Sequence, residues 1–386
     1  MSSLSPHVQE IMKCGRCGYC LGGYTAETCP ARYVIGFESG AAKGRMLAAR
    51  AMLEGRLEHS PRLVQRIYTC FLCGACKIKC EDAAKIDTVE IIRAMKAEVF
   101  DRGINIPNEV EKLGAAVETR HNIFGSAPEK RTAWSAPDIH VNENAELLYF
   151  PGCVTSLKLP EIAASTARIL NKIDVNFSLL GTTEWCCGNP LLSTGQYELA
   201  REVARHNVEE IKRRKIKHVL VSCPGCYRTL SIEYSRLLGL AEMPFDVIHA
   251  SQLFHRLALE GRMPFREMPK EVLTYHDPCE LGRLSDIYEQ PRELIRQIPG
   301  IELVEMDRNR ENAWCCGGGG GVKLVYPKQA SRVALVRLKE AMSSGATGIV
   351  TACPTCKWNL EENVESADSK LKVIDLSELV YSSLMG

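Results

Sequence analysis

The sequence has almost no excess of charge of either sign. Its 48 Lys and Arg residues are balanced by 47 Asp and Glu residues, so the formal net charge is only +1. Without a strong positive field, the chain has no general electrostatic attraction for nucleic acid or for an anionic membrane. One basic run, residues 212–217, ends a helical pattern, where cations complement the helix dipole. We therefore expect no nucleic-acid partner.

Long apolar runs are also absent. No stretch approaches the roughly 18 uninterrupted apolar residues that a membrane-spanning helix needs. Residues 1–13 lack the basic segment and apolar core that are typical of a signal peptide. These absences predict a cytoplasmic protein with no direct membrane span. Any association with the inner face of a membrane would depend on a partner.

Patterns that bind nucleotide cofactors are missing as well. The glycine run at residues 317–321 lacks the spacing of a phosphate-binding loop after a strand. We interpret the run as thin backbone beside a bound group, because glycine permits close approach. No other pattern predicts a flavin or nicotinamide site, so a partner protein would have to supply two-electron chemistry.

Cysteine, in contrast, is far above its average frequency, with 18 in 386 residues. Disulfide scaffolds are typical of short secreted chains, whereas this chain is long and shows no export signal. Its two adjacent cysteine pairs are also poorly placed for independent disulfides, because neighbouring Cβ atoms diverge. Metal ligation is the better interpretation, and all the cysteines fall into four groups. These are Cys14, Cys17, Cys20 and Cys29; Cys70, Cys73, Cys76 and Cys80; Cys153, Cys186, Cys187, Cys223 and Cys226; and Cys279, Cys315, Cys316, Cys353 and Cys356.

The first two groups each contain three cysteines spaced three residues apart, which lets one loop wrap around three corners of an iron–sulfur cubane. In two-cluster ferredoxins the fourth ligand comes from the other run. Structural zinc is the alternative, because four-cysteine zinc sites also use such pairs. The predicted ligand sets are Cys14, Cys17, Cys20 and Cys80 for one cluster, and Cys70, Cys73, Cys76 and Cys29 for the other.

The N-terminal pattern departs from a simple ferredoxin. Eight residues separate Cys20 from Cys29, and we expect this loop to be flexible enough to close; Glu81 follows Cys80 where proline is usual. Residues 40–66 and 88–100 carry helical patterns, which predicts an α+β, helix-expanded two-cluster ferredoxin domain over residues 1–125. Residues 107–145 show little periodicity, and we assign residues 126–145 to a connector.

The rest of the chain is an internal repeat. The cysteine spacing is C-x32-CC-x35-C-x2-C in the first copy and C-x35-CC-x36-C-x2-C in the second. Apolar runs at residues 147–150, 218–222 and 348–352 predict buried strands that lead into cysteines, and helical patterns lie at residues 161–172, 196–215 and 329–342. Loops after parallel strands converge at one edge of a sheet. We therefore predict two α/β domains, residues 146–268 and 269–386, that each gather five thiolates.

Five cysteines per copy exceed what one tetrahedral zinc or one cubane uses. Zinc with a spare thiol is the alternative. Adjacent cysteines suit a larger cluster, because neighbouring sulfurs can reach different irons or bridge two of them.

Both copies resemble the cysteine-rich CCG domain of heterodisulfide reductases, through Cys186–Cys187–Gly188 and Cys315–Cys316–Gly317. With the ferredoxin pattern in front, the whole chain is similar to the D-subunit family of these reductases, which looks like a fusion of the C and B subunits. The resemblance implies two [4Fe–4S] cubane clusters, two noncubane [4Fe–4S] clusters, and partner subunits such as a flavoprotein or a cytochrome b of anaerobic metabolism. The implied noncubane ligands are Cys153, Cys186, Cys187, Cys223 and Cys226 in one copy, and Cys279, Cys315, Cys316, Cys353 and Cys356 in the other.

Two hypotheses about function follow from this resemblance. In the first, the cubane clusters pass electrons to the noncubane clusters, and the ten CCG cysteines form the catalytic site for reduction of a small-molecule disulfide of the CoM-S-S-CoB type. His276 is then either a proton donor to a leaving thiolate or a structural residue. In the second, the chain only relays electrons for a glycolate, lactate or glycerol-3-phosphate dehydrogenase, an electron-transfer-flavoprotein-linked complex or a class II benzoyl-CoA reductase. Both CCG motifs are complete, which favours the first hypothesis.

Overall fold

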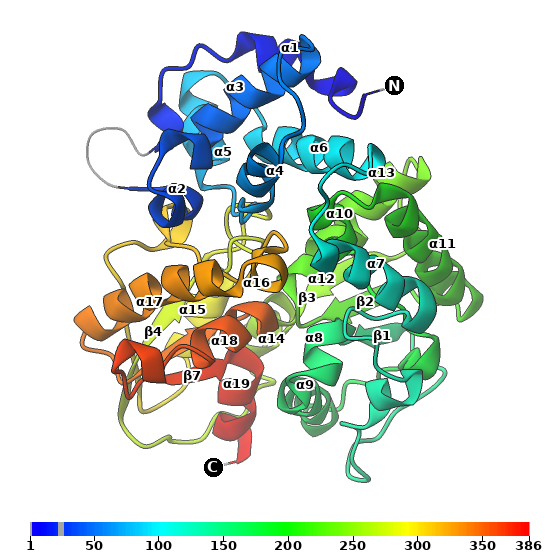
Figure 1. Ribbon diagram of the computed structural model, residues 1–386. Helices are drawn as coiled ribbons and strands as arrows, with labels where there is room; N and C mark the ends of the chain where they lie inside the picture. Colours follow the sequence, from blue (N-terminus) through cyan, green and yellow to red (C-terminus); the bar gives the residue numbers. More distant parts are fainter. Residues whose placement is uncertain (1, 22–26, 386) are drawn as a thin grey trace.

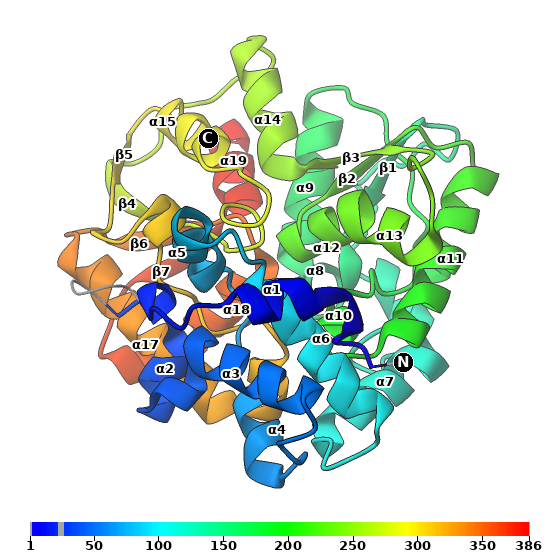
Figure 2. The same ribbon diagram turned by 90° about the horizontal axis from the view of Figure 1, so that it is seen from above.

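The computed structural model describes residues 2–21 and 27–385, which form a helical N-terminal region and two parallel β-sheets covered by helices (Figure 1). The two sheets lie side by side, and the N-terminal helices lie across one end of both (Figures 1 and 2). The predicted order of a ferredoxin-type region followed by two α/β repeats is therefore confirmed. The expected flexible loop between Cys20 and Cys29 lies largely outside the described residues.

The described part of the N-terminal region is helical, and both sheets lie after residue 146. Two helices begin at well-formed caps: Ser60 Oγ accepts from Leu63 N, and Asp87 Oδ1 accepts from Val89 N. Helix α6 is buried along almost its whole length, because it packs against N-terminal helices on one side and α10 on another. The helices are α1 (Val8–Lys13), α2 (Pro30–Ile35), α3 (Ala42–Leu53), α4 (Pro61–Tyr68), α5 (Ala75–Ala83) and α6 (Thr88–Asp101).

A further helix, α7 (Asn108–Arg120), occupies a stretch in which we expected little periodicity. Its buried residues Val110, Leu113, Gly114 and Val117 follow helical spacing, but small and charged residues between them dilute the apolar pattern. Helix α7 packs against α10 and α16 of the two repeats. The expectation of little regular structure was therefore wrong for this stretch.

The first repeat contains a three-stranded parallel sheet in the order β1-β2-β3. Its short strands are almost continuously apolar, as expected when helices cover both faces. The strands are β1 (Leu147–Phe150), β2 (His218–Val221) and β3 (Asp246–His249). The helices are α8 (Gly152–Leu157), α9 (Pro160–Lys172), α10 (Asn189–Thr194), α11 (Tyr197–Arg213), α12 (Pro224–Arg228), α13 (Tyr234–Leu238) and α14 (Ala250–Leu259).

The second repeat contains a four-stranded parallel sheet in the order β5-β4-β6-β7. The predicted strands and helices of both repeats are confirmed to within about two residues at each end. The strands are β4 (Glu271–His276), β5 (Ile301–Val304), β6 (Gly348–Thr351) and β7 (Lys372–Asp375). The helices are α15 (Glu289–Arg296), α16 (Val322–Val325), α17 (Pro327–Ser343), α18 (Pro354–Glu361) and α19 (Leu376–Met385).

One apolar core joins the two repeats. Tyr149 and Leu220 of the first sheet belong to the same buried cluster as Leu273 and Val350 of the second. Helix α19 packs on α9 across this boundary, and α14 packs on α15 (Figure 2). Such a shared core fixes the orientation of the sheets, so the loops at their carboxyl ends hold defined positions relative to each other. The division of the repeats at residues 268 and 269 falls between α14 and β4 and stays a prediction.

Candidate metal-cluster sites

The cysteines of the N-terminal region line two separate small cavities. Cys14, Cys17, Cys20 and Cys80 line the first, in which Cys80 comes from α5 and the others from the loop after α1. Arg16 and Gly18 have positive φ values of 58° and 82°, which turn this loop back around the cavity. Burial raises the pKa of the Cys20 thiol to about 11, so a bound metal must displace a proton there.

The second cavity is lined by Cys29, Cys70, Cys73 and Cys76. Cys29 precedes α2, and the other three belong to the loop before α5 and its first turn. The buried guanidinium of Arg45 also lines this cavity, and its Nη2 atom has no hydrogen-bond partner among the described residues. A buried guanidinium with an unpartnered nitrogen beside four thiols suits an anionic cluster better than an empty site. Both cavities hold the ligand sets that the swapped ferredoxin pattern predicts.

The five cysteines of the first repeat meet although they come from three distant segments. Cys153 lies in α8 directly after β1, Cys186 and Cys187 precede α10, and Cys223 and Cys226 begin α12 directly after β2. Their thiols neighbour one another in the order 153, 186, 187, 226 and 223. The parallel sheet therefore gathers the predicted set.

The second repeat reproduces this arrangement. Cys279 follows β4, Cys315 and Cys316 precede the glycine run, and Cys353 and Cys356 begin α18 after β6. Their thiols neighbour one another in the equivalent order 279, 315, 316, 356 and 353. The internal repeat in the sequence is thus a repeat in three dimensions as well.

Backbone amides support these thiol groups. Gly188 N donates to Cys186 Sγ at 3.4 Å, and Gly317 N donates to Cys315 Sγ at 3.3 Å. Gly318 N donates to Cys316 Sγ, also at 3.3 Å. Hydrogen bonds to sulfur stabilise thiolates and tune the reduction potential of iron–sulfur clusters. The gathered cysteine thiols and these amide donors therefore fit an iron–sulfur cluster, which needs several thiolate ligands.

Both groups open onto one cavity of about 100 Å³ between the repeats. Its remaining walls are mostly apolar, with Phe71, Val154 and Pro278 among them. Asn189 also lines it, and the buried Nδ2 atom of this side chain has no hydrogen-bond partner among the described residues. The cysteines on the wall are Cys153, Cys186, Cys187, Cys223, Cys226, Cys279, Cys316, Cys353 and Cys356.

The glycine run has no room for side chains, because the backbone of the loop before α5 lies against it. A Cβ atom at Gly320 would lie 2.3 Å from the carbonyl oxygen of Cys70, and one at Gly319 would lie 3.1 Å from that of Phe71. Gly319 and Gly320 also line the shared cavity. The expected close approach therefore involves the loop before α5, residues 69–74, which we call the ferredoxin-type loop.

One residue that the sequence did not indicate is Arg131, in the segment we assigned to a connector. Its buried guanidinium donates to Cys153 Sγ at 3.2 Å and to Glu184 Oε1 at 2.7 Å. Glu184 Oε1 also accepts from Gly152 N at 3.1 Å. This ion pair fixes the turn that carries Cys153. No spacing rule relates residue 131 to the CCG motif, so only the folded chain reveals the contact.

His276 is buried, with 1% of its surface exposed, and lies behind Cys316. Arg337 Nε donates to its Nδ1 atom at 3.0 Å, so Nε2 must carry the imidazole proton. His276, Cys316 and Cys356 have donor atoms within 4.8 Å of one another, as a single metal ion would require. A protonated Nε2 has no lone pair for such an ion, however, and instead donates toward Cys316. His276 is also absent from the described cavity wall, which favours a supporting role over proton donation to a substrate.

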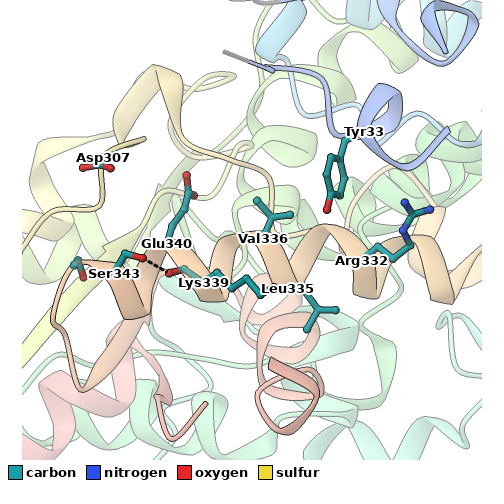
Figure 3. A pocket seen from close by; sticks show the side chains of 9 residues that line it. Tyr33, Asp307, Arg332, Leu335, Val336, Lys339, Glu340 and Ser343 are labelled. Atoms are coloured by element: carbon teal, nitrogen blue, oxygen red, sulfur yellow. Dashed lines mark hydrogen bonds between the residues drawn. The ribbon is translucent and has the colours of Figure 1, made fainter. Parts of the chain in front are cut away.

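A larger cavity of about 390 Å³ lies along α17 (Figure 3). Tyr33, Asp307 and Arg332 are among its lining residues, and no cysteine of the described chain lines it. Glu340, on its wall, accepts from Arg337 Nη1 at 2.9 Å. This cavity is therefore not a cluster site. It is connected to His276 through Glu340 and Arg337.

Two family models match the chain. One, described as a 4Fe-4S dicluster domain, matches residues 10–83. The other, described as a cysteine-rich domain and abbreviated CCG, matches residues 147–231 and again residues 273–361. These matches agree with the ferredoxin-type pattern and with the repeat, and they make the chain an iron–sulfur protein.

Whole-chain relatives support this assignment. The D subunit of the dihydromethanophenazine:CoB–CoM heterodisulfide reductase of Methanosarcina barkeri is 35% identical, over 98% of this chain and 95% of the relative. An EtfAB:quinone oxidoreductase of Syntrophomonas wolfei is 26% identical, over 83% of this chain and 47% of the relative. A hypothetical protein from Helicobacter pylori shares the fold, with a TM-score of 0.57 at 8% identity over 99% of this chain and 75% of that chain.

The match to the EtfAB:quinone oxidoreductase is lower in identity and covers under half of that protein. The match to the reductase D subunit spans both proteins almost completely. No helix in the described part of the chain is both long and apolar enough to cross a membrane. From the identity of 35% over nearly the full length, together with the dicluster and CCG matches, the chain belongs to the D-subunit family of heterodisulfide reductases, which are iron–sulfur oxidoreductases.

Proposed function

We propose that this chain carries electrons through two cubane clusters to two noncubane clusters and reduces a heterodisulfide of the CoM-S-S-CoB type. The observation that carries the proposal is the single cavity lined by cysteines of both repeats. When bound, the clusters supply single electrons and soft iron with an affinity for sulfur. The overall reaction takes up two electrons and two protons, breaks one S–S bond and releases two thiols.

The chain's own residues bind and orient the disulfide. Phe71, Val154 and Pro278 exclude water from the cavity, and the amide of Asn189 can donate a hydrogen bond to the substrate. The cavity of about 100 Å³ lies among the cysteines that would hold the clusters and is too small to enclose a whole heterodisulfide as well. The polar ends of the substrate therefore lie outside, and each sulfur faces the cysteines of one repeat.

The partner protein is proposed to dock at the first cysteine cavity. Cys17 is exposed there, whereas Cys29, Cys70 and Cys73 of the second cavity are buried. Met12 and Tyr19, on either side of Cys17 in the sequence, are 42% and 45% exposed. Exposed apolar side chains around a redox site suit a flavoprotein or cytochrome b partner. We place the chain in the cytoplasm, with any membrane contact made through that partner.

Anaerobic assays with reduced viologen and CoM-S-S-CoB test the proposal. The purified chain should oxidise viologen only when the heterodisulfide is present. Cys226→Ser should abolish this turnover, whereas Cys20→Ser, in the site at the start of the relay, should retain part of it because viologen can reduce the later clusters directly. Clusters that accept electrons from viologen but never pass them to the heterodisulfide would instead favour a pure relay.

A further inference from the structure

We propose that the second repeat, rather than the first, receives electrons from the ferredoxin-type region, and that Arg283 is the positioning residue of this junction. The inference rests on the proposed function, since it assumes clusters on the four cysteine groups. It goes further by ordering the two repeats, which the sequence pattern treats as equivalent.

The ferredoxin-type loop before α5 contacts the second repeat directly. Cys73 and Cys315 pack in one buried cluster, and their thiols lie close enough to influence each other. Arg283 Nε donates to the carbonyl oxygen of Cys73 at 2.7 Å. At Gly74 an added Cβ atom would lie 2.9 Å from Leu284 Cδ2, so the loop leaves no space against this repeat. Two predicted ligands of different clusters are therefore neighbours.

The apolar contacts of the cysteines in the second cavity also lead to the second repeat. Cys29 and Cys73 share one buried cluster with Trp314 and Cys315. The first-repeat cysteines Cys153 and Cys186 belong to another cluster, built with α7 and α11. The ferredoxin-type region does touch the first repeat, for example where Tyr68 Oη donates to Thr194 O at 2.9 Å. That contact involves no cysteine, so the short route between thiols leads to the second repeat.

Arg283 places a positive charge at this junction. The residue is 7% exposed, and its guanidinium donates to three backbone carbonyls: those of Cys73, Ala313 at 2.7 Å, and Glu311 at 3.3 Å. Cys73 belongs to the second cavity of the N-terminal region, and Ala313 lies two residues before Cys315. The charge is therefore held against the sulfur ligands of two cluster sites.

The first repeat has a different electrostatic arrangement. Arg131, which contacts Cys153, is paired with the carboxylate of Glu184 at 2.7 Å. No ion pair joins Arg283 to a carboxylate in the part of the chain that the structure describes. A buried cation with no carboxylate partner stabilises added negative charge nearby. The second-repeat site should therefore accept an electron more readily than the first.

The proposed step transfers one electron and changes no covalent bond. The group held by Cys29, Cys70, Cys73 and Cys76 is oxidised by one electron. The group held by Cys279, Cys315, Cys316, Cys353 and Cys356 is reduced by one electron. No proton moves, because the charge of Arg283 offsets part of the added negative charge.

The order of reduction is the direct test. The full chain, purified anaerobically, is mixed with reduced viologen, frozen at successive times and examined by electron paramagnetic resonance. The signal lost in Cys356→Ser identifies the second repeat, and the signal lost in Cys226→Ser identifies the first. The second-repeat signal should appear first. Earlier appearance of the first-repeat signal would overturn the inference.

Variants of Arg283 give an independent readout. In redox titrations, Arg283→Gln should shift the second-repeat signal to lower potential, with the reduced-to-oxidised ratio at fixed potential falling on the order of tenfold. Arg283→Lys should recover much of that loss, and Arg296→Gln, at an arginine whose side chain is 49% exposed, should change nothing. An unchanged titration in Arg283→Gln would contradict the assigned role.

The two proposals fail separately. Wild-type protein without iron and acid-labile sulfide would remove the proposed function itself. Protein with its clusters in place but reduced first in the first repeat would remove only the ordering. Should Arg283→Gln lose its iron, the order measured in wild-type protein and the titration of Arg283→Lys still decide the matter.

Discussion

Individual buried side chains around the cysteines determine which metal group the site can hold. Arg337 is fully buried, and its Nε atom makes Nδ1 of His276 a hydrogen-bond acceptor. The imidazole therefore presents N–H, not a lone pair, to Cys316. A supporting residue of this kind orients a ligand and tunes its basicity without binding the metal itself.

Loss of the hydrogen bond from Arg337 to His276 should increase binding of zinc. We predict that Arg337→Met, incubated with iron, sulfide and zinc together, retains several-fold more zinc than the wild-type chain, because Nε2 of His276 can then become a ligand beside Cys316 and Cys356. Arg337→Lys keeps a donor and should resemble wild type. Metal analysis after desalting gives the ratio, and equal zinc in all three proteins would contradict the tautomer assignment.

His249 is a single buried residue that should make the stability of the folded chain depend on pH. Burial lowers its pKa from 6.5 to about 4, and its ring contacts Ser251 and the carbonyl of Ser222. Between these two values the unfolded chain takes up a proton that the folded chain refuses. Stability should therefore be fully present above pH 6.5 and fall as the pH drops through 4, by up to about 3 kcal/mol.

Chemical denaturation at pH 7 and pH 5 checks this prediction. His249→Gln removes the titrating group, so its stability should depend less on pH than that of the wild type. His218→Gln is the matched control, since the side chain of His218 is 54% exposed. The account would be wrong if both variants kept the wild-type difference between the two pH values.

Among the elements, α7 shows what a pattern search misses. Its apolar positions follow helical spacing, but Ala, Glu and Lys between them weaken the contrast on which recognition by period depends. Strands β1, β2 and β6 were predictable, because short apolar runs led directly into cysteines. The contacts of Arg131 were not, since a long-range ion pair leaves no periodic trace in the sequence.

The packing of α7 against Gln196 of the first repeat can be tested at Gly114. A Cβ atom there would lie 2.1 Å from Oε1 of Gln196, whose Nε2 donates to Val110 O at 3.0 Å. Alanine gains up to about 1 kcal/mol in helix propensity, but overpacking typically costs about 1–3 kcal/mol. We predict that Gly114→Ala is net destabilising in denaturant unfolding. Ala115→Ser, on the exposed face, should shift stability by less than about 0.5 kcal/mol; a stabilised Gly114→Ala would show that α7 can move.

At the scale of the whole molecule, Lys96 joins the three regions. Its buried Nζ atom donates to the carbonyls of Cys70 at 3.2 Å, Ser193 at 3.0 Å and Gly320 at 2.7 Å. These carbonyls belong to the ferredoxin-type loop, the first repeat and the glycine run of the second. The sequence predicted three units and their ligand groups but not this junction, because a lysine in an amphipathic helix is usually exposed.

Loss of the junction should loosen the regions relative to one another. We predict that Lys96→Met costs about 3–5 kcal/mol, because three buried carbonyls lose their donor. Limited proteolysis should then cleave between the ferredoxin-type region and the repeats. Lys112→Met, on the exposed face of α7, serves as the control. Wild-type resistance in Lys96→Met would mean that apolar packing alone holds the regions together.

The four cysteine groups belong to one molecule whose fold brings nine of the cysteines to the wall of one cavity between the repeats. Chemical analysis of iron and acid-labile sulfide in the anaerobically purified chain tests this account most directly. Four clusters of four irons predict about 16 iron and 16 sulfide per chain, falling by about four of each in Cys226→Ser and, separately, in Cys356→Ser. A chain that holds only about 8 of each, or chiefly zinc, would contradict clusters in the repeats.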